Sequence, residues 1–366
     1  MHYRLALALL TPLLCACDLS HLPPARPFSI GAAVARGQFV RAAAVLKTRW
    51  QQDSDNPDLN YQLSRALAAI GELDAALPLT EKALAANPQS ADFHVQAAAV
   101  YGHQAEKASL FKQLGLARRA KKELEAAYAL DPRNVEAMYG LMMFDQQAPA
   151  FLGGDKVKAL QLAEAISALD PVRGLQAQAQ LAHERNDPIA EEALLRQAVG
   201  SNPVYSNPET YNAGMDLAAL YKSNGRAADA SQLACAALQA DPARIDAWRL
   251  LVEMAAADQC WNEIETLLKQ AAVYVPDDLS AHYAAAVAML RAGRHRHRAE
   301  TLLRRYLAQP PEANAPSRAT ARWQLATLLE QTGRVDQAIL ELERAVADEP
   351  SLEAAKRDLR RLKKAS

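Results

Sequence analysis

Large and small apolar residues recur along the chain with helical spacing. Each time, the pattern runs along one helix face, breaks at a glycine, and resumes with two alanines seven positions apart. This order occurs at Leu63, Ser64, Leu67, Gly71, Ala76 and Ala83; at Leu217, Ala218, Tyr221, Gly225, Ala230 and Ala237; and at Leu325, Ala326, Leu329, Gly333, Ala338 and Ala345. Each set predicts two helices joined by a turn at the glycine, because glycine readily adopts the left-handed conformation that ends a helix.

A recurring proline sets the length of this unit. The intervals between successive prolines scatter around 34 residues, and we assign the excess in the longer ones to loops. The prolines are Pro57, Pro88, Pro132, Pro171, Pro203, Pro242, Pro276, Pro310 and Pro350. Each is expected to end a helix, since proline has no N–H to donate. A single helix pair cannot bury its apolar face, so the repetition predicts a stack of pairs.

The residues named above resemble the signature of the tetratricopeptide repeat family, from about residue 29 to residue 350. The resemblance implies an all-α fold, a right-handed superhelical solenoid of about eight to nine helix pairs with a C-terminal cap helix. Leu352, Ala355 and Leu359, among many charged residues, are typical of such a cap.

Three units depart from the pattern. Unit one, at about residues 29–57, is degenerate, and unit three carries roughly ten extra residues between its helices, around Lys107 to Leu114. Unit four has an insert at residues 147–154, in which Gly153 and Gly154 predict a hinge rather than a phosphate-binding loop. The insert and residues 109–115 together resemble a group of bacterial exported repeat proteins, which implies no particular function.

The amino terminus predicts export. The apolar run at residues 5–14 is shorter than the roughly 20 residues that span a bilayer, and it suits a secretory signal. Leu14, Ala16 and Cys17 resemble the bacterial lipobox, which implies lipidation of Cys17; the alternative is a cleaved signal with an incidental cysteine. The expected organisation is a lipoprotein signal peptide at 1–17, a proline-rich tether at 18–28, the solenoid at 29–350 and the capping helix at 351–366. The expected location is the periplasm-facing bacterial cell envelope, with inner or outer membrane left open.

Composition narrows the function. With 41 basic and 42 acidic residues, the chain lacks the basic excess of a nucleic-acid-binding protein. Half of the residues are hydrophobic but only 6% are aromatic, which favours helices over sheets. The sequence shows no catalytic constellation, so we predict neither an enzyme nor a cofactor. Cys235 and Cys260 either form a disulfide or stay two buried thiols, and we favour the thiols.

The resemblance also implies where ligands bind, because the first helices of these repeats line a concave face. Carried over by position, the groove residues are Tyr61, Arg65, Tyr139, Met215, Lys222, Arg249, Tyr283, Arg291 and Trp323. Aromatic residues and arginine dominate binding hot spots, which favours a partner-binding groove. The alternative is that some of these rings pack between helices.

A second candidate is the basic cluster between Arg291 and Arg305. The helix dipole disfavours cations at the start of a helix, so their presence there suggests that they bind an acidic partner. The favoured interpretation is nevertheless that the cluster is a solvated surface. Histidines flank Arg296, but the neighbouring guanidinium groups repel a metal ion, so we predict no metal site.

The sequence therefore predicts a lipid-anchored adaptor or scaffold that captures a peptide or helix of an envelope protein. The alternative is an accessory lipoprotein of polysaccharide export or secretion, which contacts an anionic glycan or its synthase. Oligomeric state is not readable from the sequence.

Overall fold

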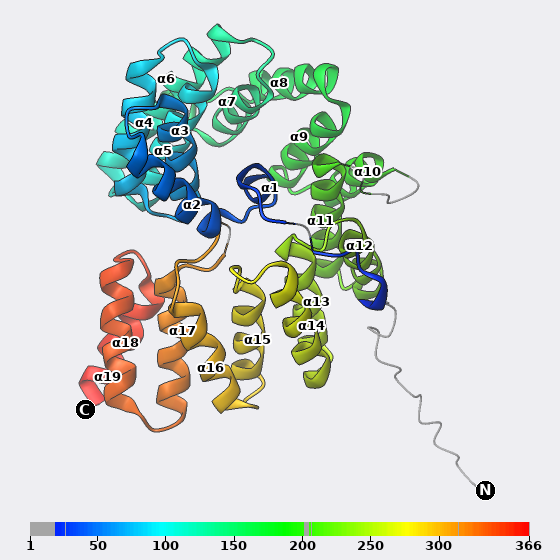
Figure 1. Ribbon diagram of the computed structural model, residues 1–366, viewed down its shortest axis with the longest axis vertical. Coiled ribbons are helices and arrows are strands. Elements are labelled where there is room, and N and C mark those ends of the chain that lie inside the picture. The colour runs from blue at the N-terminus through cyan, green and yellow to red at the C-terminus, as the bar shows by residue number, and fades with distance from the viewer. Residues whose placement is uncertain (1–18, 26, 201–204, 206, 314, 366) are drawn as a thin grey trace, which may run out of the picture.

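The computed structural model describes residues 19–25, 27–200, 205, 207–313 and 315–365, and the segment 1–17 that the sequence predicts as a signal peptide, with Cys17, lies outside them. In this part of the chain α1 to α18 form nine consecutive helix pairs and α19 follows them, which confirms the all-α solenoid (Figure 1). The helices are α1 Ile30–Ala35, α2 Phe39–Gln52, α3 Pro57–Ala69, α4 Leu73–Ala86, α5 Ala91–Lys107, α6 Leu110–Leu130, α7 Val135–Gln147, α8 Lys156–Leu169, α9 Pro171–Glu184, α10 Pro188–Val199, α11 Pro208–Ser223, α12 Ala227–Ala240, α13 Ile245–Ala257, α14 Trp261–Tyr274, α15 Ser280–Arg291, α16 Arg296–Leu307, α17 Arg318–Gln331, α18 Val335–Asp348 and α19 Glu353–Ala365. Short 3-10 turns, η1 Leu19–His21 and η2 Ala150–Leu152, complete the described elements.

The recurring small residues lie where two helices of a pair approach each other. Ala76, Ala230 and Ala338 are all fully buried, as are the large residues Leu217 and Leu325 beside them. Small side chains at these positions let large ones from the partner helix pack closely, so the periodic pattern corresponds to the core.

The turns inside the pairs follow the glycine pattern except in units three, five and seven. Gly71 and Gly225 have φ angles of +81° and +75°, the left-handed conformation that closes the first helix. In units five and seven Asn186 and Gln259 adopt the same conformation, at +54° and +57°, without being glycine. A tertiary position can therefore impose this turn on a residue that propensity alone does not favour.

The prediction for unit three is wrong: its extra residues do not form a loop. They lengthen α5 to 17 residues and α6 to 21 residues, and only Ala108 and Ser109 separate the two helices. The segment is rich in alanine, leucine, lysine, arginine and glutamate, which favour helix, so it extends the hairpin.

The unit-four insert turns back sharply, as its two glycines predict. Gly153 has a φ of +88°, and a Cβ on Gly154 would lie 1.9 Å from the carbonyl oxygen of Ala148. Lys121 of α6 donates a hydrogen bond of 2.7 Å to the carbonyl of Gly153. The insert is therefore fastened to the preceding unit.

Cys260 carries a thiol, whose sulfur donates to the carbonyl of Asp258 at 3.7 Å. Cys235 is disulfide-bonded, but not to Cys260, so the expectation of two thiols is wrong for Cys235 and holds for Cys260 alone. Within the described residues, none of the helices is long and apolar enough to cross a bilayer.

The solenoid curves until its first unit meets its later ones. In Figure 1 the pairs follow one another round a ring, with α1 in its middle and α2 facing the half that contains α15 to α17. The backbone N–H of Phe39 donates to Glu312 at 2.7 Å, across 273 residues of sequence. Repeats in a solenoid usually contact only their neighbours, so this contact is additional to the stacking.

Candidate partner-binding groove

The inner side of the ring carries a groove formed by first helices of consecutive units. One part is a cavity of about 850 Å³ between α7, α9, α11 and the start of α13. A second part, of about 890 Å³, lies between α13, α15 and the residues before α17. Both are lined by Lys222, Arg249 and Glu253, so they form one continuous surface, called here the concave groove.

Six of the nine predicted groove residues meet in this groove. Tyr139 and Met215 line its first part, Tyr283 and Arg291 line its second part, and Lys222 and Arg249 line both. These residues come from α7, α11, α13 and α15, because the repeat places equivalent positions of successive first helices side by side.

The other three predicted residues lie elsewhere. Tyr61 and Arg65 line a separate cavity of about 790 Å³ with Phe28 and residues of α1, which lies next to them on the inner side. Trp323 lies on α17, and its indole N–H donates to Asp358 of the cap helix α19 at 2.8 Å. Trp323 therefore contacts the cap helix and does not line the concave groove as the described residues define it.

Acidic residues balance the basic ones in the groove. Lys222 pairs with Glu253 of the next unit, Arg173 pairs with Glu136 of the preceding unit, and Arg249 lies 3.8 Å from Asp246. The first and second of these pairs join neighbouring repeats. They could not be found from one repeat alone, since each partner is 31 to 37 residues away.

Asp216 is one of the residues that line the first part. Burial raises the pKa of its carboxyl above the usual range, while the amide of Gln176, which donates to it at 3.4 Å, opposes the shift. Nearby, the guanidinium of Arg244 stacks on the ring of Tyr211 at 3.9 Å and donates to Asn212. The first part is thus polar, and most of its charges already have partners.

The second part differs, because small apolar side chains form its floor. Ala256, Ala284, Val287 and Ala288 lie between the cations of its rim. Tyr283 is half-buried and packs against Tyr306 with the two rings tilted and their centroids 5.3 Å apart, so only part of its ring serves the groove. Burial also raises the pKa of the Tyr283 hydroxyl, which therefore stays protonated and able to donate. Tyr283 therefore both lines the groove and packs against a neighbouring helix, so each of the two interpretations of the aromatic rings applies to it.

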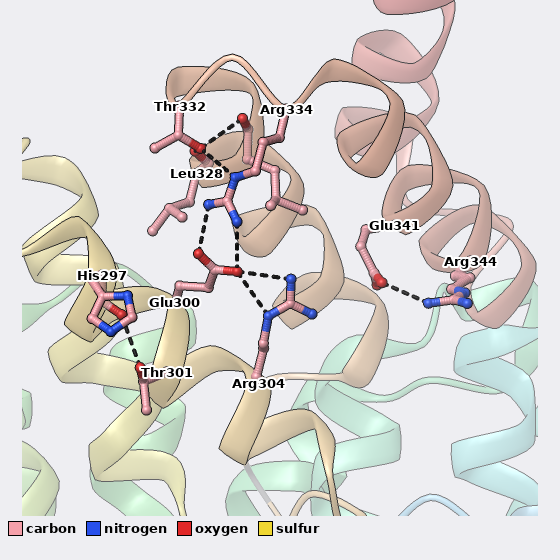
Figure 2. A network of polar contacts seen from close by, with 10 residues as sticks. His297, Glu300, Thr301, Arg304, Leu328, Thr332, Arg334, Glu341 and Arg344 are labelled. Carbon is pink, nitrogen blue, oxygen red and sulfur yellow. Dashed lines mark hydrogen bonds and ion pairs between the residues drawn. The ribbon is translucent and has the colours of Figure 1, made fainter.

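The basic cluster is partly neutralised. Figure 2 shows Glu300 accepting hydrogen bonds from Arg304 and Arg334, and Arg298 forms two hydrogen bonds with Glu265. The remaining basic side chains, from Arg291 to His297, are exposed. This arrangement supports the solvated-face interpretation. In the part of the chain that the structure describes, His, Cys, Asp and Glu side chains form no group of three that could hold a metal ion.

Two segments of the chain match tetratricopeptide repeat models, at residues 33–101 and 294–354. Together with the helix pairs, these matches show that the chain carries tetratricopeptide repeats arranged as a solenoid. Proteins of this class generally serve as scaffolds for protein–protein interaction and are typically not enzymes.

Solved structures have the same architecture. Yeast Tom70 is 14% identical, with a TM-score of 0.52 over 91% of this chain and 86% of that one. Human IFIT1, in a dimer with m7Gppp-AAAA, is 17% identical, with a TM-score of 0.50 over 93% of this chain and 82% of that one. At these identities the likeness shows the fold alone. A comparison with curated proteins finds no match.

Proposed function

We propose that this protein is a membrane-tethered adaptor of the bacterial cell envelope, which holds a segment of a partner protein in the concave groove. The observation that carries the proposal is the meeting of Tyr139, Met215, Lys222, Arg249, Tyr283 and Arg291 on one continuous inner surface. The groove combines an apolar floor with charged rims, the composition that binds an amphipathic segment. The role is binding, with no chemistry assigned to the groove.

The alternative partner, an anionic glycan, has less support. Glu136, Asp216, Asp246 and Glu253 line the groove and offset its cations. An anionic chain would have to displace or approach these carboxylates, which is electrostatically unfavourable. A peptide with both charges and apolar side chains fits the groove better.

The groove is tested by photo-crosslinking in cells. A photoreactive amino acid replaces Met215 or Tyr283, and a control position is Ile189 on α10, which is 83% exposed. We expect the same envelope protein to be crosslinked from both groove positions and not from Ile189.

With that protein purified, Tyr139→Ala combined with Arg249→Ala should weaken binding about thirtyfold or more, whereas Arg118→Ala on α6 should not. Equal crosslinking at Ile189, or unchanged affinity in the double variant, would remove the groove assignment.

The lipid tether is a separate prediction. Cys17→Ser should abolish incorporation of a labelled fatty acid and move the protein from the membrane fraction to the soluble fraction. Two or three acyl chains bind a bilayer far more strongly than one, so their loss should move most of the protein into the soluble fraction. Cys15→Ser is the matched control and should leave both measurements unchanged. Continued labelling of the Cys17→Ser protein would contradict the assignment.

A further inference from the structure

The turn between α1 and α2 contacts three loops of the distant half of the solenoid. Arg36 forms an ion pair of 2.7 Å with Asp241, and the side-chain amide of Gln38 donates to the carbonyl of Ala243 at 2.5 Å. Arg41 lies 3.8 Å from Asp277. The loops that receive these contacts precede α13, α15 and α17, so one turn touches three successive units.

Glu312, in the loop before α17, makes the most specific of these contacts. One carboxyl oxygen accepts the N–H of Phe39 at 2.7 Å and the other accepts the N–H of Val40 at 2.9 Å. These are the first two residues of α2, whose N–H groups have no partner inside the helix. Within the described residues, the Gln38 side chain does not cap its own helix. A glutamate from the far side of the ring therefore caps α2.

The two surfaces are complementary in charge. The receiving loops present Asp241 and Asp277, while the turn and the start of α2 present Arg36 and Arg41. Glu312 adds two oxygen acceptors at the positive end of the α2 dipole. These contacts are all polar.

The junction also lacks a shared apolar core. The buried cluster around α1 to α4 and the cluster that runs from α9 to α19 are separate in the described residues. Leu19 and Leu22, before α1, add two partly buried apolar contacts to the second cluster. Because each repeat is stabilised by its neighbours, these non-neighbour contacts can separate without unfolding any repeat.

We propose that the turn between α1 and α2 is a releasable clasp, which closes the solenoid into a ring and controls access to the concave groove. When the clasp is closed, the ring surrounds the groove and α1 lies in its middle (Figure 1). An extended segment or single helix then fits the interior, whereas a folded domain requires the clasp to open. The part of this proposal that concerns access rests on the proposed function of the groove.

Closure itself is tested without any partner by exchanging the charges of one ion pair. Arg36→Asp and Asp241→Arg, made singly in the full chain, place like charges together and should open the ring. The double variant restores an opposite-charge pair and should close it again. Lys47→Asp, an exposed charge reversal on α2, is the matched control.

Two measurements report whether the ring is closed. Small-angle scattering should show a larger radius of gyration for each single variant, and protection of the amides at residues 39 and 40 against hydrogen exchange should fall about tenfold or more. Circular dichroism should show unchanged helix content, which separates opening from unfolding. Recovery of both readouts in the double variant would support the clasp, while unchanged single variants or a double variant no better than the singles would overturn it.

Access is tested next, with the photoreactive residue at position 215 as the probe. We expect the crosslinking yield of a folded partner domain to rise in the single variants and to return to its original value in the double variant. A constant yield in variants that do open would remove the gating role. Loss of all crosslinking at position 215 would instead count against the proposed function.

Discussion

Replacing Trp248 by alanine is expected to lower the free energy of unfolding by about 3–5 kcal/mol, the range for deleting a large buried aromatic side chain. Trp248 is 0% exposed and lies on α13, in the middle of the largest apolar cluster. Its indole N–H donates to the carbonyl of Pro242 at 2.8 Å, and its ring stacks on Tyr274 of α14. The substitution therefore leaves a cavity and an unsatisfied carbonyl at a joint between units.

The measurement is urea unfolding followed by circular dichroism. Trp261→Ala is the matched control, because Trp261 is only half-buried at the start of α14, where its ring lies tilted against that of the exposed His295. We expect this control to lose about 1 kcal/mol or less. Equal losses for the two tryptophans would show that Trp248 is not the central packing residue of the C-terminal half. Repeat arrays can unfold in stages, so the transition of α13 and its neighbours should shift most.

Raising the pH is expected to weaken closure of the ring. Burial raises the pKa of Glu312 from the ordinary value of 4.5 to about 8, and Asp278 and Asp277 raise it further, while the N–H groups of Val40 and Phe39 oppose the shift. The raised pKa belongs to the closed state, so closing takes up a proton. The contribution of protonated Glu312 to closure is therefore fully present below about pH 4.5 and is lost as the pH rises through about 8.

The closed-to-open ratio should fall by up to about tenfold per pH unit within this window. Scattering at pH 5.5 and pH 8.5 measures the change, with helix content as the control for unfolding. Glu312→Gln stays uncharged at both values and should remove most of the dependence. The other charged groups at this junction are Asp278 and Asp277 in the loop before α15, Arg41 on α2, and the Arg36–Asp241 ion pair. An undiminished pH dependence in Glu312→Gln would assign the effect to one of the aspartates instead.

The groove illustrates how far positional reasoning extends. Tyr139, Met215, Lys222, Arg249, Tyr283 and Arg291 share equivalent places in successive first helices, and the repeat brings them together. The position of Trp323 follows the same rule, but the cap helix stacks on it through Asp358. Tyr61 and Arg65 occupy equivalent places too, yet α1 lies beside them. The repeat rule describes the middle of an array and fails at its ends, where the neighbouring element is not another repeat.

The polar partners within the groove were not predicted for a related reason. Glu136 and Asp216 are ordinary helix residues when one unit is considered alone. Their importance comes from the neighbouring unit, which places Arg173 and Gln176 opposite them. Pairing between units depends on how two helices are rotated relative to each other, which periodicity does not specify.

The sequence alone determined the helices, the turns at Gly71 and Gly225, and the buried alanines, because these depend on local conformation and on a 3.6-residue period. Only the tertiary structure decided that α5 and α6 absorb the extra residues of unit three, and that Glu312 caps α2 from the far side of a ring. Curvature is the sum of small rotations between successive units. No single repeat contains that sum, so the closure of the ring is visible only when all the units are assembled.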